Sequence, residues 1–234
     1  VLDVAWTIAG KPAEVWPEAG WLCFPCNIAE PRFKAYRLGG VVGFKDILKG
    51  ANHDVTCLYG GAAITGADNA GIGLCPLDSP LVSFDRPGLW KYSTDFTPTH
   101  PNVYVNLYNN QWSTNFQLWS EGTWTSRVRI WAIQAYSTGP SLTQPSIEAR
   151  YPLLAGSSDG AAGALPPTQP GAAVERPGVL ATALVQRDEG LLLRLWEQSN
   201  SDTPIAVRFP MGASFAEAKP CDLRGTSKIG RAHV

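Results

Sequence analysis

The chain has 234 residues, of which 44% are hydrophobic and 17% charged, so it holds enough apolar side chains for a substantial core. Its formal net charge of −1 argues against nucleic-acid binding, which requires concentrated Lys and Arg. No apolar run approaches the ~20 residues that a membrane-spanning helix needs. We therefore expect neither a nucleic acid nor a membrane as a partner.

Both ends of the chain have unusual sequences. Apolar residues alternate with polar or small ones from Leu2 to Ile8, so a strand pattern begins almost at the first residue. We therefore expect Val1 to lie inside a longer parent domain, because natural termini usually begin with a few disordered residues. At the other end, Ile229–Val234 can be encoded as ATC GGA AGA GCA CAC GTC, one reading frame of a common sequencing adapter. Residues 225–234 are accordingly expected to be a non-native tail.

Short strand patterns separated by Gly and Pro follow along the chain, which holds 23 Gly, 19 Pro and 9 Trp. We predict strands at Leu2–Ile8, Gly20–Phe24, Asp54–Leu58, Gly73–Cys75, Leu81–Phe84, Val103–Tyr108, Trp124–Ile133, Val179–Val185, Leu191–Trp196, Ile205–Phe209 and Ser214–Lys219. The alternation within them is typical of antiparallel sheets. In the sixth of these strands it places Tyr104, Asn106 and Tyr108 on one face.

A change in composition divides these strands into two groups. Residues 156–177 are rich in Gly, Ala, Pro and Ser and predict a linker. The predicted fold is therefore all-β. A large antiparallel β-sandwich, truncated at its N-terminus, covers residues 1–155, and a partial, smaller β-sandwich covers residues 178–224.

The five cysteines form a sparse set: Cys23, Cys26, Cys57, Cys75 and Cys221. Cys23 and Cys26 have the spacing of a zinc knuckle, but a second such pair is missing and no paired His ligands accompany them. Buried free thiols are the favoured interpretation, and they favour a reducing, cytoplasmic compartment. We predict no metal site in this chain.

The segment Asn106–Trp119 is the strongest candidate for a binding site. It leaves a strand and then places three amides, two Trp and two hydroxyls within about ten residues. Trp offers a flat surface on which the apolar face of a sugar stacks, and Asn supplies paired donors and acceptors. The alternative is structural, in which the asparagines cap turns and the tryptophans close the end of the sandwich.

Carboxylates and arginines give weaker signals. Hydrolysis of a glycosidic bond needs two carboxylates facing each other across the substrate. No spacing predicts such a pair among Asp46, Asp54, Asp68, Asp78, Asp85, Asp95 and Glu121, and solvated turn residues are the favoured interpretation. Arg127 and Arg129 lie on the polar face of a strand, where solvation is favoured over pairing.

Several segments, in order, resemble the C-terminal β region of glycoside hydrolase family 38-like proteins, the α-mannosidase group. They are Lys11–Leu22, Pro80–Val82, Asn106–Phe116, Arg127–Ile130, Arg150–Ala155, Leu165–Pro166 and Leu193–Trp196. Together they span most of residues 1–224, and Asn106–Phe116 is the most specific. The resemblance implies a parent enzyme with a zinc-bound catalytic barrel, a helical bundle and β-sandwiches that include a galactose-mutarotase-like supersandwich.

In such enzymes the nucleophile and the zinc ligands lie in the catalytic part, so the resemblance implies no catalytic residue, metal or cofactor in this fragment. It implies that the β region packs on its own catalytic domain and lends side chains to the carbohydrate cleft. The substrate-binding candidates are Asn109, Asn110, Trp112, Asn115 and Trp119. Gln111, Gln117 and Cys57–Gly61 depart from the family pattern, so α-mannoside is only the family default.

Three functions therefore stay open for this chain. The first is a non-catalytic C-terminal portion of an α-mannosidase-like glycoside hydrolase, which by itself is inactive. The second is a freestanding carbohydrate-binding sandwich. The third is a purely structural sandwich, in which the segment Asn109–Trp119 is buried and fully hydrogen-bonded within the protein.

Overall fold

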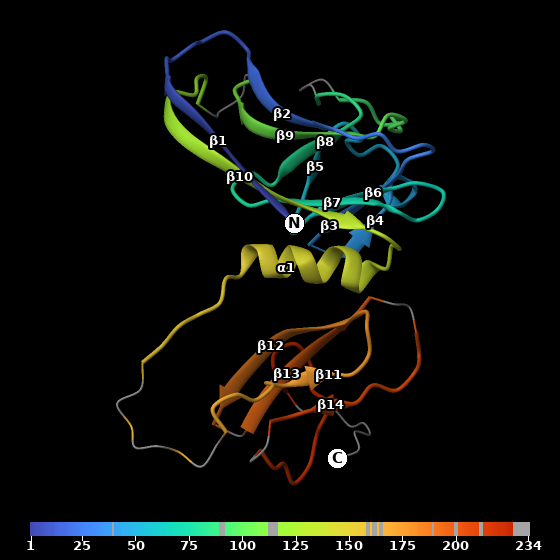
Figure 1. Cartoon of the computed structure of the whole chain (residues 1–234), viewed down its shortest axis with the longest axis vertical. Helices are drawn as coiled ribbons and strands as arrows, with labels where there is room; N and C mark the ends of the chain where they lie inside the picture. Colours follow the sequence, from blue (N-terminus) through green and yellow to red (C-terminus); the bar gives the residue numbers. More distant parts are fainter. Residues whose placement is uncertain are drawn as a thin grey trace. The chain divides into compact units, whose positions relative to one another are not determined.

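The computed structural model describes residues 1–38, 40–88, 92–111, 117–157, 160, 163, 166–188, 190–198, 201–210 and 213–226. The chain divides into two compact units, Val1–Leu153 and Leu154–Val234, which we describe separately. Strands β1 to β10 and the helices belong to the first unit, and strands β11 to β14 to the second (Figure 1). Strands make up 41% of the structure and helices 8%, which confirms the predicted all-β class.

Two antiparallel sheets build the first unit. The six-stranded sheet has the order β1-β10-β7-β6-β3-β4, and the four-stranded sheet has the order β2-β9-β8-β5. The strands are β1 (Leu2–Lys11), β2 (Ala19–Pro25), β3 (Arg32–Arg37), β4 (Gly40–Val42), β5 (Thr56–Cys57), β6 (Ala62–Thr65), β7 (Gly71–Pro76), β8 (Leu81–Phe84), β9 (Asn102–Asn109) and β10 (Gly122–Ile133).

The two sheets share one hydrophobic core, which makes the first unit a β-sandwich. The six-stranded sheet contributes side chains such as Phe33 and Val128, and the four-stranded sheet contributes Phe84 and Val105. The rings of Phe33 and Phe84 meet edge to face with their centroids 5.4 Å apart. Full burial of each such side chain contributes about 1.5–3 kcal/mol, so this core is the main source of the unit's stability.

The prediction missed three strands of the six-stranded sheet, namely β3, β4 and β6. Lys34 and Arg37 interrupt the apolar pattern of β3, although Phe33, Ala35 and Tyr36 are buried. Strand β6 is fully buried, and its four residues contain two alanines. Small residues carry little strand signal by themselves, so pairing with β3 and β7 decides the conformation of this segment.

The prediction that Tyr104, Asn106 and Tyr108 share one face was wrong. The β2–β9 ladder shifts its register between Gly20 and Trp21, so one extra residue of β9 lies in a bulge. Because side chains alternate with period two, the shift turns Tyr108 to the other face. Its ring meets Trp124 edge to face with the centroids 5.6 Å apart.

Three short helical segments complete the described part of the first unit. They are the 3-10 helix η1 (Phe44–Asp46), the π-helix η2 (Thr138–Thr143) and the helix α1 (Gln144–Arg150). Pro145 lies in the first turn of α1, where its missing N–H costs no hydrogen bond. Ser146 is buried against Gly60 and Gly61, where a Cβ atom on either glycine would lie within 3 Å of Ser146. Close packing on these glycines therefore holds α1 to the sheet.

The described part of the second unit contains two two-stranded antiparallel sheets. Strand β11 (Ala173–Val174) pairs with β14 (Val207–Arg208), and β12 (Val179–Arg187) pairs with β13 (Gly190–Glu197). Strand β11 lies inside the predicted linker, and no strand forms at the predicted Ser214–Lys219. Most of the predicted tail, residues 227–234, lies outside the described residues.

The described helices are all short. None of them combines the length and the hydropathy that crossing a membrane requires.

Candidate functional site

The side chain of Asn110 joins two loops at one end of the sandwich. It directly follows β9 and is only 6% exposed. Its Oδ1 accepts a hydrogen bond from the backbone N–H of Glu18 at 2.6 Å. Its Nδ2 lies 2.9 Å from the carbonyl oxygen of Trp16 and 2.8 Å from that of Leu118. One buried amide therefore brings the loop between β1 and β2 next to the loop between β9 and β10.

An ion pair reinforces this junction. Lys11 ends β1, its side chain is 9% exposed, and its ammonium group pairs with the carboxylate of Glu18. The same ammonium donates to the carbonyl oxygen of Ser120 at 2.9 Å and lies 5.0 Å from the ring centroid of Tyr108. A charge this deeply buried needs such partners to offset its lost hydration. We call Lys11, Glu18 and Asn110 the clasp.

The clasp holds four apolar side chains at the surface. The exposed fractions are 69% for Val15, 75% for Trp16, 46% for Leu118 and 39% for Trp119. Residues 16 and 118 are neighbours because their carbonyl oxygens contact the same amide nitrogen. We call these four residues the clasp surface. Large apolar side chains exposed at one loop end are typical of a surface that binds a ligand or another protein.

The five sequence-predicted site residues have different places. Asn109 Oδ1 accepts from the N–H of Gln111 at 3.3 Å, which is a local turn contact. Asn110 is turned inward and forms the clasp. Trp119 lies on the clasp surface, and Trp112 and Asn115 lie outside the described residues.

Sequence reasoning missed Lys11, Glu18 and Trp16 as parts of the site. All three lie in the segment Lys11–Leu22, more than ninety positions before Asn110 in the chain. The one available signal was a Trp between two acidic residues, Glu14 and Glu18, in a Pro-containing loop. Only the pairing of β2 with β9 brings this loop to the predicted site.

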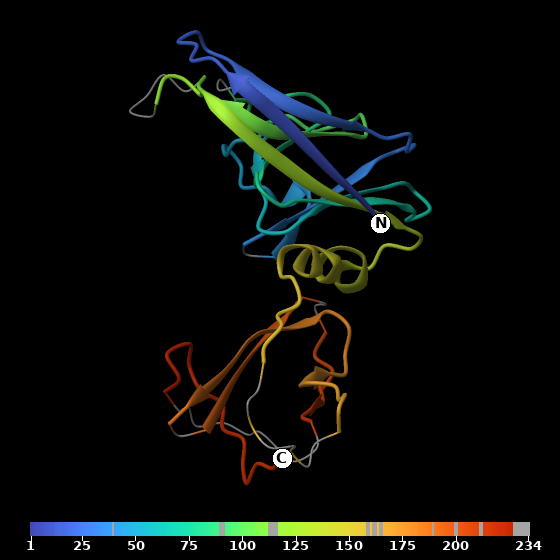
Figure 2. The ribbon, with the colours of Figure 1, turned by 60° about the vertical axis from the view of Figure 1, so that its left-hand side comes forward.

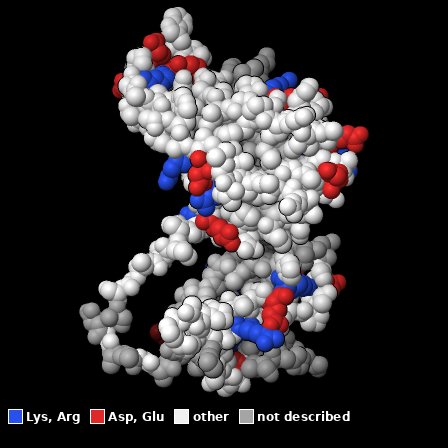
Figure 3. Space-filling model, in the orientation of Figure 1, with Lys and Arg blue, Asp and Glu red and all other residues white. Residues whose placement is uncertain are grey.

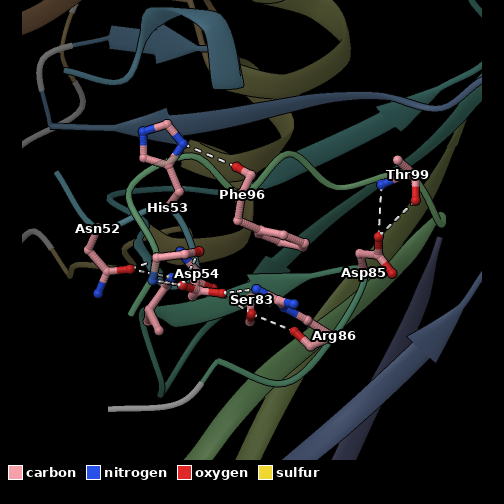
Figure 4. Close-up of polar contacts among 10 residues, drawn as sticks. Asn52, His53, Asp54, Ser83, Asp85, Arg86, Phe96 and Thr99 are labelled. Atoms are coloured by element: carbon pink, nitrogen blue, oxygen red, sulfur yellow. Dashed lines mark hydrogen bonds and ion pairs between the residues drawn. The ribbon is translucent and has the colours of Figure 1, made fainter. Parts of the chain in front are cut away.

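A second polar cluster surrounds Asp54, which is 6% exposed (Figure 4). Its carboxylate accepts from Arg86 Nη2 at 2.8 Å and from Ser93 Oγ at 2.8 Å. Burial alone would raise the pKa of Asp54, but the hydrogen bonds from Ser93 and Arg86 outweigh burial and lower it. The guanidinium of Arg86 also lies 3.9 Å from the ring centroid of Phe96. This cluster ties the loop after β8 to the loop before β5.

Asp85 fixes the far end of the same loop (Figure 4). Its Oδ2 accepts from the N–H of Thr99 at 2.8 Å, and its Oδ1 lies 2.9 Å from His100 Nδ1. Burial acts to raise the pKa of Asp85, but these hydrogen bonds lower it. Asp85 therefore holds this loop in place through hydrogen bonds, as Asp54 does.

Both predicted surface arginines form ion pairs, contrary to the favoured interpretation of solvation. Arg127 donates to Asp78 from Nε at 2.9 Å and from Nη2 at 2.6 Å. Arg129 makes the same forked contact with Asp3 across the β1–β10 ladder. Asp78 and Asp85, like Asp54, were expected as solvated turn residues, and each is instead hydrogen-bonded within the protein.

The cysteines do not match the prediction of buried thiols. Only Cys75 is buried, whereas Cys23 and Cys57 are exposed and the other two are half-buried. Burial raises the pKa of Cys75. Within the part of the chain that the structure describes, the cysteines are free, and no three His, Cys, Asp or Glu side chains gather in a way that could hold a metal ion.

The fold and the clasp define an all-β protein with an antiparallel sandwich and an apolar surface at one loop end. No protein-family model, curated protein or solved structure matches the chain. The resemblance to the α-mannosidase group therefore stays a prediction.

Proposed function

We propose that the first unit contacts carbohydrate through the clasp surface, as the non-catalytic β region of a glycoside hydrolase of the α-mannosidase kind. The observation that carries the proposal is the exposure of Trp16 and Trp119 on two loops that one buried amide holds together. The catalytic groups and the zinc of such an enzyme would come from its catalytic domain. The catalytic domain would therefore be the protein partner of the first unit.

The physical basis is the match between tryptophan and sugar. The C–H face of a pyranose stacks on an aromatic ring, and its hydroxyls need donors and acceptors at the rim. The clasp supplies the carboxylate of Glu18, which is 27% exposed beside Lys11. Because Asn110 has its carboxamide bound to backbone groups, it positions the loops, and Trp16 and Trp119 are the proposed contact residues.

A purely structural sandwich is the second candidate, and the burial of Asn110 favours it. In that case the clasp surface packs on protein and binds no sugar. A freestanding carbohydrate-binding module would share the contact residues of our proposal but would reach its full affinity without a catalytic domain, whereas in our proposal this chain by itself binds sugar only weakly.

Saturation-transfer NMR with the full chain tests the proposal. With methyl α-mannoside as the probe, we expect transfer to the sugar protons and a dissociation constant of about 1–10 mM, which corresponds to a binding free energy between roughly −4 and −3 kcal/mol. The double substitution Trp16→Ala and Trp119→Ala should weaken binding about tenfold, because each ring contributes on the order of 0.5–1.5 kcal/mol.

Trp6→Ala is the matched control, since Trp6 on β1 is also 39% exposed but lies outside the clasp surface. It should leave the dissociation constant unchanged. Absence of transfer to α-mannoside and to the matching glucoside and galactoside would rule the proposal out. An equal loss of sugar affinity in Trp6→Ala would show that the effect of the double variant does not come from the clasp surface.

A further inference from the structure

Strand β1 is a long free edge. Among the described strands it pairs with β10 on one side and with none on the other. Figure 2 shows β1 running along β10 at the margin of the six-stranded sheet. Of its ten residues, Leu2–Lys11, seven are exposed and three are half-buried, and none is buried. The backbone N–H and C=O groups that point away from β10 are therefore open to another strand.

The side of β1 that faces the interior is apolar and incompletely covered. Leu2 and Trp6 lie on the same face as the core residue Val128, yet they are 60% and 39% exposed. A strand added beside β1 would remove these side chains from water.

The usual protection of an edge is missing from this strand. Natural edges are blocked by Lys, by Pro or by shortness. From Leu2 to Gly10 the only charged residue is Asp3, whose carboxylate is already held by Arg129, and the first Lys and Pro are Lys11 and Pro12. By contrast, β4 and β5, which end the far sides of the two sheets, have three and two residues.

Figure 3 shows the charged side chains of the face that it presents in small separate groups, most of them with both signs. Because the only charged side chain of Leu2–Gly10, Asp3, is already paired with Arg129, a charged partner strand would find little to pair with along this edge. A neutral strand of alternating apolar residues fits, and β1 is itself such a strand.

We propose that two copies of this chain associate through β1, antiparallel, about a two-fold axis at Trp6. Trp6 is the midpoint of Leu2–Gly10, so this register gives the greatest overlap. It places Val4 opposite Ile8 on the apolar face and Asp3 opposite Ala9 on the polar face. No like charges meet, and the two six-stranded sheets become one continuous sheet.

The two-fold axis also closes the assembly. A contact that uses the same strand on both copies leaves no β1 edge free, so growth ends at the dimer. Because β4, at the other end of the six-stranded sheet, has only three residues, the structure favours a closed dimer over a polymer.

The test begins with sedimentation equilibrium of the full chain under reducing conditions, because Cys23 and Cys57 are exposed and could form disulfide-linked dimers. We expect a reversible dimer at a chain concentration of ~100 µM, which corresponds to a binding free energy of roughly −5.5 kcal/mol or better. Amide hydrogen exchange should show the outward N–H groups of β1 protected at high concentration and unprotected on dilution.

A charge pair at Ala5 and Thr7 tests the register, because the Ala5 of one copy faces the Thr7 of the other. The double variant A5K/T7K should weaken the dimer about tenfold or more, since like charges meet twice, and A5K/T7E should restore it. Both variants lose the hydrogen bond between the Thr7 and Thr125 hydroxyls, so the comparison is matched.

A wild-type chain that stays monomeric at ~100 µM, or whose mass grows without limit, would overturn the proposal. Equal dissociation constants for the two double variants would overturn the register. If either variant fails to fold, the concentration dependence of amide exchange in the wild-type chain still decides whether β1 forms the dimer interface.

Discussion

At the scale of single residues, buried polar side chains organise the loops of this sandwich. Asp54 joins Arg86 and Ser93, and Asn110 joins Trp16 and Leu118. Each spans segments that are remote in the chain, and each has its polar atoms paired, as burial demands. These side chains hold the loops together, and removing one of them leaves its hydrogen-bond partners unpaired.

Asp54 predicts a pH dependence of stability. Hydrogen bonds lower its pKa in the folded state below the ~3.9 of an unfolded chain. The folded state then binds fewer protons than the unfolded state, so the contribution is fully present above pH ~4 and is lost as the pH falls below that value. Asp54→Asn should cost about 1–3 kcal/mol at neutral pH, and its deficit relative to wild type should shrink towards pH ~3.

Urea unfolding of both proteins between neutral pH and pH ~3 measures this difference. Asp46→Asn is a suitable control, because Asp46 is an exposed aspartate that caps the short helix η1 and lies outside the cluster around Asp54. A deficit of Asp54→Asn that stays constant with pH would contradict the assignment of the charge effect to this carboxylate.

At the scale of elements, the β7–β10 ladder depends on one close contact. Gly73 pairs with Trp131, and a Cβ atom on Gly73 would lie 2.3 Å from the indole ring. The indole Nε1 donates to the carbonyl oxygen of Ser141 at 2.9 Å, so the ring is held against the sheet and against η2. The ring can move only by giving up this hydrogen bond.

Gly73→Ala should therefore lower the free energy of unfolding by about 1–3 kcal/mol, the usual cost of overpacking. Chemical denaturation followed by the fluorescence of Trp131 and the other tryptophans measures the change. Gly156→Ala is the matched control, because a Cβ there meets no atom within 4 Å and the expected change is within about 0.5 kcal/mol. Equal stability of the two variants would mean that the ring relaxes freely.

At the scale of the whole molecule, the two units differ in the source of their stability. The core cluster lies entirely between Phe33 and Val128, within the first unit. The described part of the second unit has two sheets of two strands each, and ribbons of that size are marginal alone.

We expect the fragment 1–153 to fold by itself and to unfold cooperatively with the same urea midpoint as the main transition of the full chain. Amide dispersion in NMR spectra and urea unfolding check this. A fragment that lacks dispersion would show that residues 154–234 complete the first unit. The fragment 154–234, tested in parallel, should show weak dispersion.

The sequence by itself determined the all-β class and most strand positions, because alternation in segments such as Trp124–Ile133 is a local property of the chain. It also pointed to the loop after β9, since Asn-rich turns and tryptophans are visible without a fold. Tertiary structure alone decided the rest. The sequence of β6 shows little strand pattern, so its pairing with neighbouring strands was needed to define it. Asn110 joins two loops because the pairing of β2 with β9 brings Trp16 to its side chain. The exposure of Trp6 follows from a missing neighbour beside β1, which no local pattern records.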